Sequence, residues 1–376
     1  MSADPSAASA ADIPRRGSLS QLASAYAQGA TTTEGDKVEE EFDDPHTLQR
    51  FIMTELGSTG VAVFMSSISL ACKYIAMSVR KAGISKLYGL AGSANASGDE
   101  VKKLDLVSNE VMINALKASR ALSVMVSEEN PEPIIVEANE RGKYCIAFDP
   151  LDGSSNIDCN VSTGTIFGIY EKSSPGPGAL RDILRPGNEL KAAGYCMYGS
   201  ATMLVVTWGN GVHGFTLDPA LGEFVLTHKN LTVPAVPKTI YSANEGNYSL
   251  WDEPTRKFVE MCKNHAPKPY SARYVGSMVS DVHRTLLYGG IFMYPADRKS
   301  KNGKLRVLYE GFPMALLVEQ AGGVASCGYF KGKVLRLLDI VPQAIHERCP
   351  VILGCKRDCN PVLRHIHDSK ARSAKL

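Results

Sequence analysis

The sequence lacks the features of a membrane-spanning, secreted or nucleic-acid-binding protein. No apolar run reaches the length of about 18 residues that a transmembrane helix needs. No apolar signal-peptide core follows the first methionine, so we expect no secretory signal. The formal net charge is only +2, which gives no general electrostatic reason to expect a nucleic acid partner.

Cysteines are present, but they lack the pattern of a disulfide framework or of a zinc site. The nine cysteines are odd in number and irregularly spaced, and no two of them have the Cys-x-x-Cys spacing. Free thiols in a reducing compartment are therefore expected. With 376 residues, of which 44% are hydrophobic and 21% charged, the chain is long enough for two globular domains.

We divide the chain into a tail and two domains. Residues 1–42 hold few large apolar side chains and are predicted to be disordered, because they bury too little surface to offset their ordering entropy. Residues 43–231 are predicted to form an N-terminal domain with a long helix over residues 61–80 and an antiparallel meander over residues 201–228. Alternating strands and helices then predict a second, substrate-binding domain over residues 232–376, and the fold class is α/β (α+β).

The run DPLDGSS at residues 149–155 is the strongest chemical signal. It follows an apolar segment at residues 144–148 that is typical of a buried strand, and Pro150 and Gly153 predict a sharp turn after that strand. Two aspartates therefore leave the strand end together, followed by a glycine and two serines whose N–H groups can face an anion. Carboxylates hold hard cations such as Mg²⁺ and N–H groups hold phosphate, so the run predicts metal-dependent phosphate chemistry.

Four further acidic side chains are candidates for the same site: Asp99, Glu128, Glu129 and Glu310. Clustered carboxylates repel one another strongly in a low-dielectric cleft, and divalent cations would relieve that repulsion. Two cations about 4 Å apart would also stabilise both the attacking and the leaving oxygen of a phosphoryl transfer. That these side chains meet in one site is a hypothesis that the sequence itself does not test.

Longer segments make the chain resemble the fructose-1,6-bisphosphatases, a family within the lithium-sensitive, magnesium-dependent phosphatase superfamily. The strongest segments are residues 98–105 (GDEVKKLD), 126–129 (VSEE), 141–144 (RGKY), 149–159 (DPLDGSSNIDC), 242–246 (SANEG), 273–278 (RYVGSM) and 303–306 (GKLR). The aspartate run indicates the superfamily, and the later segments indicate its sugar-bisphosphatase branch. The resemblance covers residues 46–365 and implies a layered α-β-α-β-α sandwich of two domains, the sugar-phosphatase fold.

The resemblance also implies a role for individual residues. The implied metal ligands are Glu128, Glu129, Asp149, Asp152, Glu310 and the carbonyl oxygen of Leu151. The residues implied to polarise the attacking water are Asp99 and Glu129. The residues implied to bind the departing phosphate are Gly153, Ser154 and Ser155. The residues implied to bind the sugar and its second phosphate are Asn244, Arg273, Tyr274, Met278, Tyr294 and Lys304.

Cofactor, assembly and regulation follow from the same resemblance. The implied cofactor is Mg²⁺, with Mn²⁺ or Zn²⁺ as alternatives, and more than one ion per site. The implied assembly is a homotetramer in which Arg273 reaches into the pocket of a neighbouring subunit. The implied inhibitor is AMP, bound at a distant effector site.

The effector site and the sugar pocket each depart from the family pattern. At the effector site Lys143 and Tyr144 match the family pattern, and Ser58 replaces a threonine. The positions that depart are Gly60, Ala62 and Glu171. Glu171 reverses the charge of the usual arginine, so AMP inhibition is expected with altered contacts. In the sugar pocket, Asn247 stands where the family has a tyrosine, and the sequence leaves open whether Tyr248 takes that role.

The leading functional hypothesis is hydrolysis of the 1-phosphate of D-fructose 1,6-bisphosphate to fructose 6-phosphate and phosphate, a step of gluconeogenesis. A sedoheptulose-1,7-bisphosphatase is the alternative, because that substrate presents the same two phosphates. An inositol monophosphatase is disfavoured, since it needs no cations such as Arg273 and Lys304 for a second phosphate. A non-catalytic sensor of AMP or sugar phosphate is disfavoured because all the acidic positions are present.

The last three residues also suggest a location. Ala374, Lys375 and Leu376 resemble the Ser-Lys-Leu peroxisomal import address. We therefore predict a peroxisome-like organelle such as a glycosome, with the cytoplasm as the alternative. No membrane partner is expected.

Overall fold

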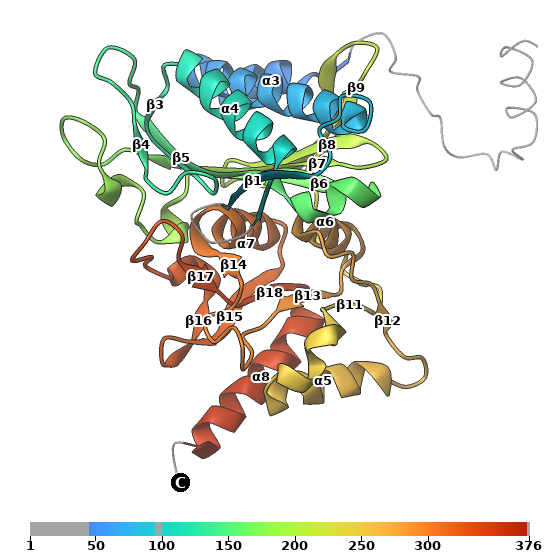
Figure 1. The fold of residues 1–376 in the computed structure, drawn as a ribbon. Coiled ribbons are helices and arrows are strands. Elements are labelled where there is room, and N and C mark those ends of the chain that lie inside the picture. Colours follow the sequence, from blue (N-terminus) through green and yellow to red (C-terminus); the bar gives the residue numbers. More distant parts are fainter. Residues whose placement is uncertain (1–44, 95–99, 374–376) are drawn as a thin grey trace, which may run out of the picture. The chain divides into compact units, whose positions relative to one another are not determined.

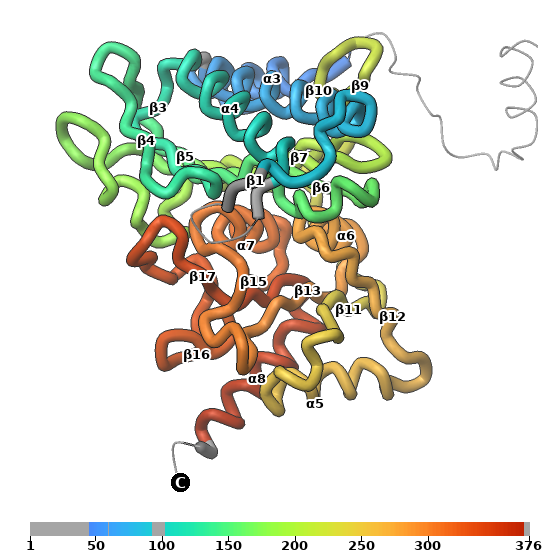
Figure 2. The backbone as a smooth tube through the Cα atoms, in the orientation of Figure 1, coloured from blue at the N-terminus to red at the C-terminus, as the bar shows by residue number. Residues whose placement is uncertain are grey.

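The computed structural model describes residues 45–94 and 100–373. Two sheets and three pairs of helices alternate in five layers (Figure 1), which confirms the predicted α-β-α-β-α sandwich. From one outer layer to the other, the helix pairs are α3 (Thr59–Lys81) with α4 (Lys103–Ala118), α6 (Met278–Tyr288) with α7 (Phe312–Gln320), and α5 (Glu253–Lys263) with α8 (Lys356–Ser373). The backbone trace in Figure 2 likewise shows α6 and α7 between the two sheets.

The first sheet has eight strands in the order β10-β9-β8-β7-β6-β5-β3-β4. Their bounds are β3 Leu122–Ser127, β4 Ile134–Ile135, β5 Tyr144–Asp152, β6 Thr163–Glu171, β7 Ala192–Tyr198, β8 Thr202–Thr207, β9 Val212–Asp218 and β10 Glu223–His228. Only the pair β3–β5 is parallel. The antiparallel chain of β8, β9 and β10 confirms the meander predicted over residues 201–228.

The second sheet has six strands in the order β12-β11-β13-β18-β15-β16. Their bounds are β11 Ile240–Ser242, β12 Ser271–Ala272, β13 Ile291–Tyr294, β15 Val324–Phe330, β16 Lys333–Arg336 and β18 Val351–Gly354. Strand β11 runs parallel to both its neighbours, and the other pairs are antiparallel. Two small ribbons flank the sheets: β1 (Leu90–Ala94) with β2 (Glu100–Lys102), and β14 (Leu305–Arg306) with β17 (Arg348–Cys349).

Three hydrophobic clusters hold the layers together. One cluster joins α3 and α4 to the first sheet, and another joins the second sheet to α5 and α8. The central cluster lies between the two sheets around α6 and α7, and it contains residues as far apart in the sequence as Val126 and Leu353. The residues before and after position 231 therefore share one core.

Helix α3 runs over Thr59–Lys81, which confirms the helix predicted over residues 61–80. Ser58 caps its N-terminus, since the Ser58 hydroxyl accepts a hydrogen bond from the N–H of Val61 at 3.3 Å. By length and apolar composition its Gly60–Lys81 segment would be able to cross a membrane, yet half of the most apolar stretch is buried. Since that buried side belongs to the hydrophobic cluster against the first sheet, we interpret α3 as a core helix.

Candidate active site

The acidic run lies within strand β5 rather than after it. Strand β5 continues through Pro150 and ends at Asp152, so the turn predicted at Pro150 is wrong. The chain turns only at Gly153, where φ is 77°, a value that favours glycine. A 3-10 helix, η2 (Ser154–Cys159), begins directly after this turn.

A β-bulge explains both the tolerated proline and the direction of the two aspartates. Asp149 pairs with Ile166 and Asp152 with Gly164, so β5 holds one residue more than β6 over this stretch. Bulges accept a proline, because the missing N–H costs no ladder hydrogen bond there. In a regular strand, residues three apart point to opposite faces, and the extra residue brings Asp149 and Asp152 to the same face.

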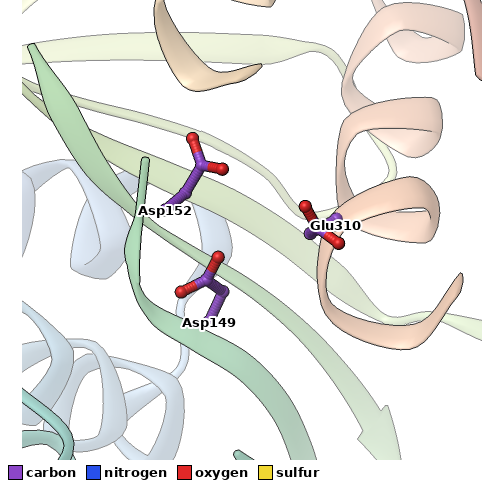
Figure 3. A group of neighbouring side chains, drawn as sticks. All are labelled: Asp149, Asp152 and Glu310. Atoms are coloured by element: carbon purple, nitrogen blue, oxygen red, sulfur yellow. The ribbon is translucent and has the colours of Figure 1, made fainter. Parts of the chain in front are cut away.

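The two aspartates meet a glutamate from a distant part of the chain. Oxygen atoms of Asp149, Asp152 and Glu310, here called the acidic cluster, lie within 4.8 Å of one another. Figure 3 shows the aspartates on β5 and Glu310 on the helical segment opposite them. Glu310 belongs to η6 (Val307–Gly311), a π-helical turn that leads into α7. All three side chains are buried.

Burial and mutual repulsion make the acidic cluster reluctant to ionise. Burial raises the pKa of Asp152 to about 7, and the nearby charge of Glu128 contributes to this rise. The pKa values of Asp149 and Glu310 are also raised well above their ordinary range, first by burial and then by Glu128. A buried set of oxygen donors that repel one another fits a hard divalent cation, which would offset the repulsion.

Glu128 and Glu129 extend the acidic cluster toward the cleft. They follow strand β3, where the N–H of Glu128 donates to Phe148 of the neighbouring strand at 3.2 Å. Both line a cleft of about 620 Å³ together with the acidic cluster and Leu151. Asp99, the other predicted acid, lies outside the described residues.

A buried arginine, which the sequence reasoning missed, lies behind these acids. Arg306 is 3% exposed, and its guanidinium is 4.0 Å from a carboxylate oxygen of Glu128. Its backbone N–H donates to the carboxylate of Glu310. Arg306 therefore connects the acids that follow β3 with the acid of η6. It stands in the quoted GKLR segment, but its burial depends on contacts distant in sequence.

The predicted phosphate-binding residues lie beside the acidic cluster. Gly153, Ser154 and Ser155 all line the cleft. The first N–H groups of a helix have no acceptor within that helix, so those at the start of η2 are available to an anion. The side-chain amide of Asn156 donates to the carbonyl of Gly276 at 3.1 Å, which fixes η2 against the loop of residues 273–277.

The opposite wall of the cleft carries most of the residues predicted to bind the sugar. Five of the six line it: Asn244, Tyr274, Met278, Tyr294 and Lys304. The sixth, Arg273, is exposed and does not line the cleft of its own chain. Lys304 follows Gly303, whose φ is 77° and where a Cβ atom would lie 2.3 Å from the backbone of Cys349. Only glycine fits this close approach.

Asp281 is the second residue that sequence reasoning missed. Its fully buried carboxylate accepts hydrogen bonds from the hydroxyl of Ser242 at 2.9 Å and from the N–H groups of Val275 and Gly276 at 3.1 Å. It also pairs with Arg284 at 2.6 Å. These contacts hold the 273–277 loop in place. The only sign of this role in the sequence is the position of Asp281 in the first turn of helix α6, where an acid is common.

Asp105 also lines the cleft, and the sequence reasoning gave it no role. Burial raises the pKa of its carboxyl group to about 6. Its carboxylate accepts a hydrogen bond from the N–H of Lys102 at 2.8 Å, which caps α4. Lys102 in turn pairs with Asp158 of η2 at 2.8 Å. A charged network therefore joins α4 to the phosphate side of the cleft.

Tyr248 does not take the place of the tyrosine that the family has at position 247. Its hydroxyl donates to Glu260 of α5 at 2.9 Å, and its ring lies 5.9 Å from the ring of Trp251. Neither Asn247 nor Tyr248 is among the described residues that line the cleft.

The predicted effector residues lie near α3, away from the cleft lining. Ser58 caps this helix, and the ring of Tyr144 stacks on Phe64 of the same helix at 5.8 Å. The ammonium group of Lys143 lies 5.1 Å from the centre of the Tyr144 ring and pairs with Glu171 at 3.5 Å. Glu171, which differs from the family pattern, thus competes with a phosphate group for the ammonium of Lys143.

Two family models together span nearly all of the described chain. The model described as "Fructose-1-6-bisphosphatase, N-terminal domain" matches residues 46–229, and the one described as "Fructose-1-6-bisphosphatase, C-terminal domain" matches residues 234–367. The chain belongs to the fructose-1,6-bisphosphatase family. Membership in this family implies a divalent metal, with which the acidic cluster is compatible.

Individual members of the fructose-1,6-bisphosphatase family are similar over most of their length. Cytosolic fructose-1,6-bisphosphatases of Brassica napus and Arabidopsis thaliana are each 56% identical, over 85% of this chain and 95% and 94% of theirs. The crystal structure of Leishmania major fructose-1,6-bisphosphatase in holo form is 42% identical with a TM-score of 0.81. That similarity covers 86% of this chain and 99% of the Leishmania chain.

The names of these relatives contradict the predicted location. The plant fructose-1,6-bisphosphatases are named as cytosolic, which points to the cytoplasm rather than to a glycosome or another peroxisome-like organelle. Ala374, Lys375 and Leu376, on which the prediction rested, lie outside the described residues. A match of three residues is short enough to arise by chance, which is why this signal misled.

Proposed function

We propose that the protein hydrolyses the 1-phosphate of D-fructose 1,6-bisphosphate to fructose 6-phosphate and phosphate, as in gluconeogenesis. The observation that carries the proposal is one cleft with the buried acidic cluster on one wall and Lys304 with Tyr274 on the other. The first wall suits a metal-bound phosphate and the second suits a second phosphate on the same sugar. The names of the relatives support fructose 1,6-bisphosphate as the substrate.

The proposed metal ligands are those of the acidic cluster with Glu128, Glu129 and the carbonyl oxygen of Leu151. Their oxygen atoms are the donors that Mg²⁺ prefers, and we propose Mg²⁺, with more than one ion per site. Such cations would lower the pKa of an attacking water and stabilise the leaving oxygen. Carboxylates of Glu129 and Asp99 would polarise that water, so no nucleophilic side chain is required.

The phosphate that leaves is proposed to lie at the start of η2. The N–H groups of Ser154 and Ser155 would donate to its equatorial oxygens, where negative charge must be met by fixed dipoles. Gly153 allows this approach because it has no side chain at the turn. The proposed division of labour follows the predicted domains, with residues 43–231 carrying most metal ligands and residues 232–376 carrying the sugar wall.

The second phosphate and the sugar are proposed to bind the opposite wall. Lys304 and Tyr274 would donate to the phosphate, while Asn244, Met278 and Tyr294 would contact the sugar. Sedoheptulose 1,7-bisphosphate is the second candidate, because it offers the same two phosphates at the ends of a longer sugar. The two substrates would differ only in contacts along the sugar wall.

A substrate panel tests the activity directly. Phosphate release is measured from fructose 1,6-bisphosphate, sedoheptulose 1,7-bisphosphate, fructose 6-phosphate and inositol 1-phosphate, each with Mg²⁺ and with excess chelator. We expect the highest kcat/KM for fructose 1,6-bisphosphate, with no activity under chelator. A higher kcat/KM for sedoheptulose 1,7-bisphosphate would make that sugar the proposed substrate instead. Activity that persists with excess chelator would overturn the metal-dependent mechanism.

We also propose that the chain forms a homotetramer. Helix α3 exposes an apolar stripe on the side away from its core: Val63, Leu70, Tyr74 and Met77 are each more than 40% exposed. Such a stripe favours contact with another protein surface. The exposed position of Arg273, outside its own cleft, agrees with a role in the cleft of a neighbouring subunit.

Complementation between two inactive variants tests whether subunits share sites. Arg273→Ala and Asp149→Asn chains are purified separately, mixed, dissociated and reassembled. Hybrid assemblies should recover part of the wild-type activity, because some sites would combine an intact Arg273 with an intact acidic cluster. Absence of recovery in hybrids whose mixed composition is proved by mass spectrometry would contradict a shared site.

We propose that AMP inhibits the enzyme at the site of Ser58, Lys143 and Tyr144, with weakened phosphate contacts. The ion pair between Lys143 and Glu171 supports the weakening, because AMP would have to displace Glu171. Activity measured against rising AMP concentration tests the proposal. An unchanged rate at millimolar AMP would show that AMP is not an inhibitor of this enzyme.

A further inference from the structure

A chain of hydrogen bonds lies behind the acidic cluster and links segments that are distant in sequence. The hydroxyl oxygen of Tyr309 is 2.7 Å from Nδ1 of His346, and Nε2 of His346 is 3.0 Å from the carbonyl oxygen of Asn130. Tyr309 precedes Glu310 on η6, and Asn130 follows Glu129. His346 therefore bridges the two segments that supply acids from opposite sides of the site.

The direction of each hydrogen bond follows from its last acceptor. A backbone carbonyl only accepts, so Nε2 of His346 must carry the proton that points to Asn130. In a neutral ring Nδ1 then accepts, which makes the Tyr309 hydroxyl the donor. Burial lowers the pKa of His346, which agrees with a neutral ring. The Tyr309 oxygen remains able to accept a hydrogen bond from the guanidinium of Arg306, which lies near it.

These contacts close a ring around the acids. Arg306 pairs with Glu128 at 4.0 Å and donates its backbone N–H to Glu310. Tyr309 is fully buried, so its hydroxyl has no access to water that would replace a lost partner. The links from Tyr309 to His346 and from His346 to Asn130 are directional hydrogen bonds. The Tyr309–His346–Asn130 bridge therefore connects the segment that follows β3 with the segment η6.

We propose that the Tyr309–His346–Asn130 bridge is a positioning device that sets the affinity of the acidic site for divalent cations. Tyr309 and His346 do not line the cleft, so they act through Glu310, Glu128 and Glu129 rather than on the substrate. Groups that hold metal ligands in place typically change metal affinity by about 10- to 100-fold when they are replaced. The inference rests on the proposed metal-dependent function.

Metal binding in the absence of substrate tests the bridge. The dissociation constant of Mn²⁺ is measured by the electron paramagnetic resonance signal of the free ion, for wild type, Tyr309→Phe and His346→Leu. Both variants should bind Mn²⁺ about 10- to 100-fold more weakly, because each breaks the bridge while nearly preserving side-chain volume. In activity assays, the concentration of Mg²⁺ for half-maximal rate should rise, while KM for sugar bisphosphate should change less than threefold.

A conservative replacement separates positioning from mere packing. In His346→Gln, the side-chain NH₂ donates to the Asn130 carbonyl and the side-chain oxygen accepts from Tyr309, so the bridge is rebuilt. This variant should recover Mn²⁺ affinity to within about fivefold of wild type. If His346→Gln and His346→Leu bind Mn²⁺ equally well, the hydrogen bonds do not set the affinity and the proposal is overturned.

The chain offers a matched control in a second buried tyrosine–histidine pair. The hydroxyl oxygen of Tyr195 is also 2.7 Å from Nδ1 of its partner, His283, and neither residue lines the cleft. Tyr195→Phe removes a comparable hydrogen bond and should lower the thermal midpoint to a similar degree as Tyr309→Phe. Its Mn²⁺ affinity should stay at the wild-type value. If Tyr195→Phe and Tyr309→Phe weaken Mn²⁺ binding equally, the effect is one of general stability and the bridge has no special role.

The result is separable from the fate of the proposed function. Wild type that releases no phosphate from sugar bisphosphates, yet binds Mn²⁺ more tightly than Tyr309→Phe, would overturn the function and retain the bridge. Wild type that is active, with Tyr309→Phe binding Mn²⁺ within threefold of it, would overturn the bridge and retain the function. If Tyr309→Phe does not fold, the comparison of His346→Gln with His346→Leu decides.

Discussion

The two walls of the cleft are built on opposite principles. The metal wall consists of buried acids that arise from a bulged strand and a π-helical turn, and their charges repel one another. The sugar wall consists mostly of exposed or half-buried side chains, with Met278 as its buried member. One buried acid, Asp281, holds the loop of residues 273–277. The metal wall therefore costs folding stability until a cation binds, whereas the sugar wall does not.

The difference shows that a buried carboxylate can either stabilise the folded protein or destabilise it until a ligand binds. Asp281 is buried with four hydrogen-bond donors around it, so its burial stabilises a loop. Asp152 is buried with a hydrogen bond from the N–H of Val279 at 3.1 Å, with the backbone of Met278 beside it, and with Glu128 and Asp281 as charged neighbours. The first arrangement is complete in the protein itself, and the second is completed by a ligand.

The largest expected effect is loss of activity with a gain in stability. Asp149→Asn should lower kcat by about 10³-fold or more, because a cation ligand is lost. In chelator at pH 8, its thermal midpoint should rise above that of wild type, because the neutral amide ends the repulsion within the acidic cluster. Steady-state kinetics measure the fall in kcat, and thermal melts measure the rise in the midpoint.

A buried aspartate outside the cleft is the matched control for that variant. Asp182 accepts hydrogen bonds from the hydroxyl of Ser174 and from the N–H groups of Ser173, Ser174 and Ala179, and together they hold its pKa at about 2 against the effect of burial. Asp182→Asn should lower the thermal midpoint and leave kcat unchanged. A midpoint that falls equally in both variants would remove the distinction between the two kinds of buried acid.

The next effect concerns the sugar wall. Lys304→Gln should raise KM for fructose 1,6-bisphosphate by about 10- to 100-fold, as expected for a charged hydrogen bond of about 1.5–3 kcal/mol. Its thermal midpoint should not change, because Lys304 is exposed. Lys301→Gln, on the same segment but not lining the cleft, is the control and should leave KM unchanged. Equal KM values for both variants would contradict a phosphate site at Lys304.

A smaller effect is a stability that falls with rising pH when no metal is bound. In the metal-free protein, Asp152 has a pKa of about 7 against 3.8 in the unfolded chain. Between these values the folded state holds a proton that the unfolded state has lost, so stability falls as pH rises from about 4 to 7. Thermal midpoints at pH 5 and pH 8 should show this fall in chelator, and saturating Mg²⁺ should remove most of it. A flat profile in chelator would contradict the raised pKa.

The smallest effect lies outside both walls. Glu171→Ala frees Lys143 from an exposed ion pair, which solvent screening keeps weak, so the AMP concentration for half-inhibition should fall by less than about fivefold. Glu110→Ala, an exposed acid on α4, is the control. An unchanged response in Glu171→Ala would show that this ion pair does not compete with AMP.

The sequence allowed the layers, the helix over residues 61–80 and the clustering of acids to be predicted, because these depend on local patterns and on quoted motifs. The turn at Pro150 was wrong because a bulge is a property of two strands, and nothing in β5 alone reveals its register with β6. The supports Asp281, Arg306 and His346 were missed for the same reason, since their partners lie in other segments. The roles given to single site residues stay predictions.

The central hydrophobic cluster has a consequence for any attempt to divide the chain. It draws side chains such as Val126 and Leu353 from both halves into one core. Fragments ending at residue 231 and beginning at residue 232 would each expose their share of it, at about 25 cal/mol for every Å² of apolar surface. Each fragment alone should be insoluble, whereas coexpressed fragments should fold around each other and behave as one protein despite the missing peptide bond.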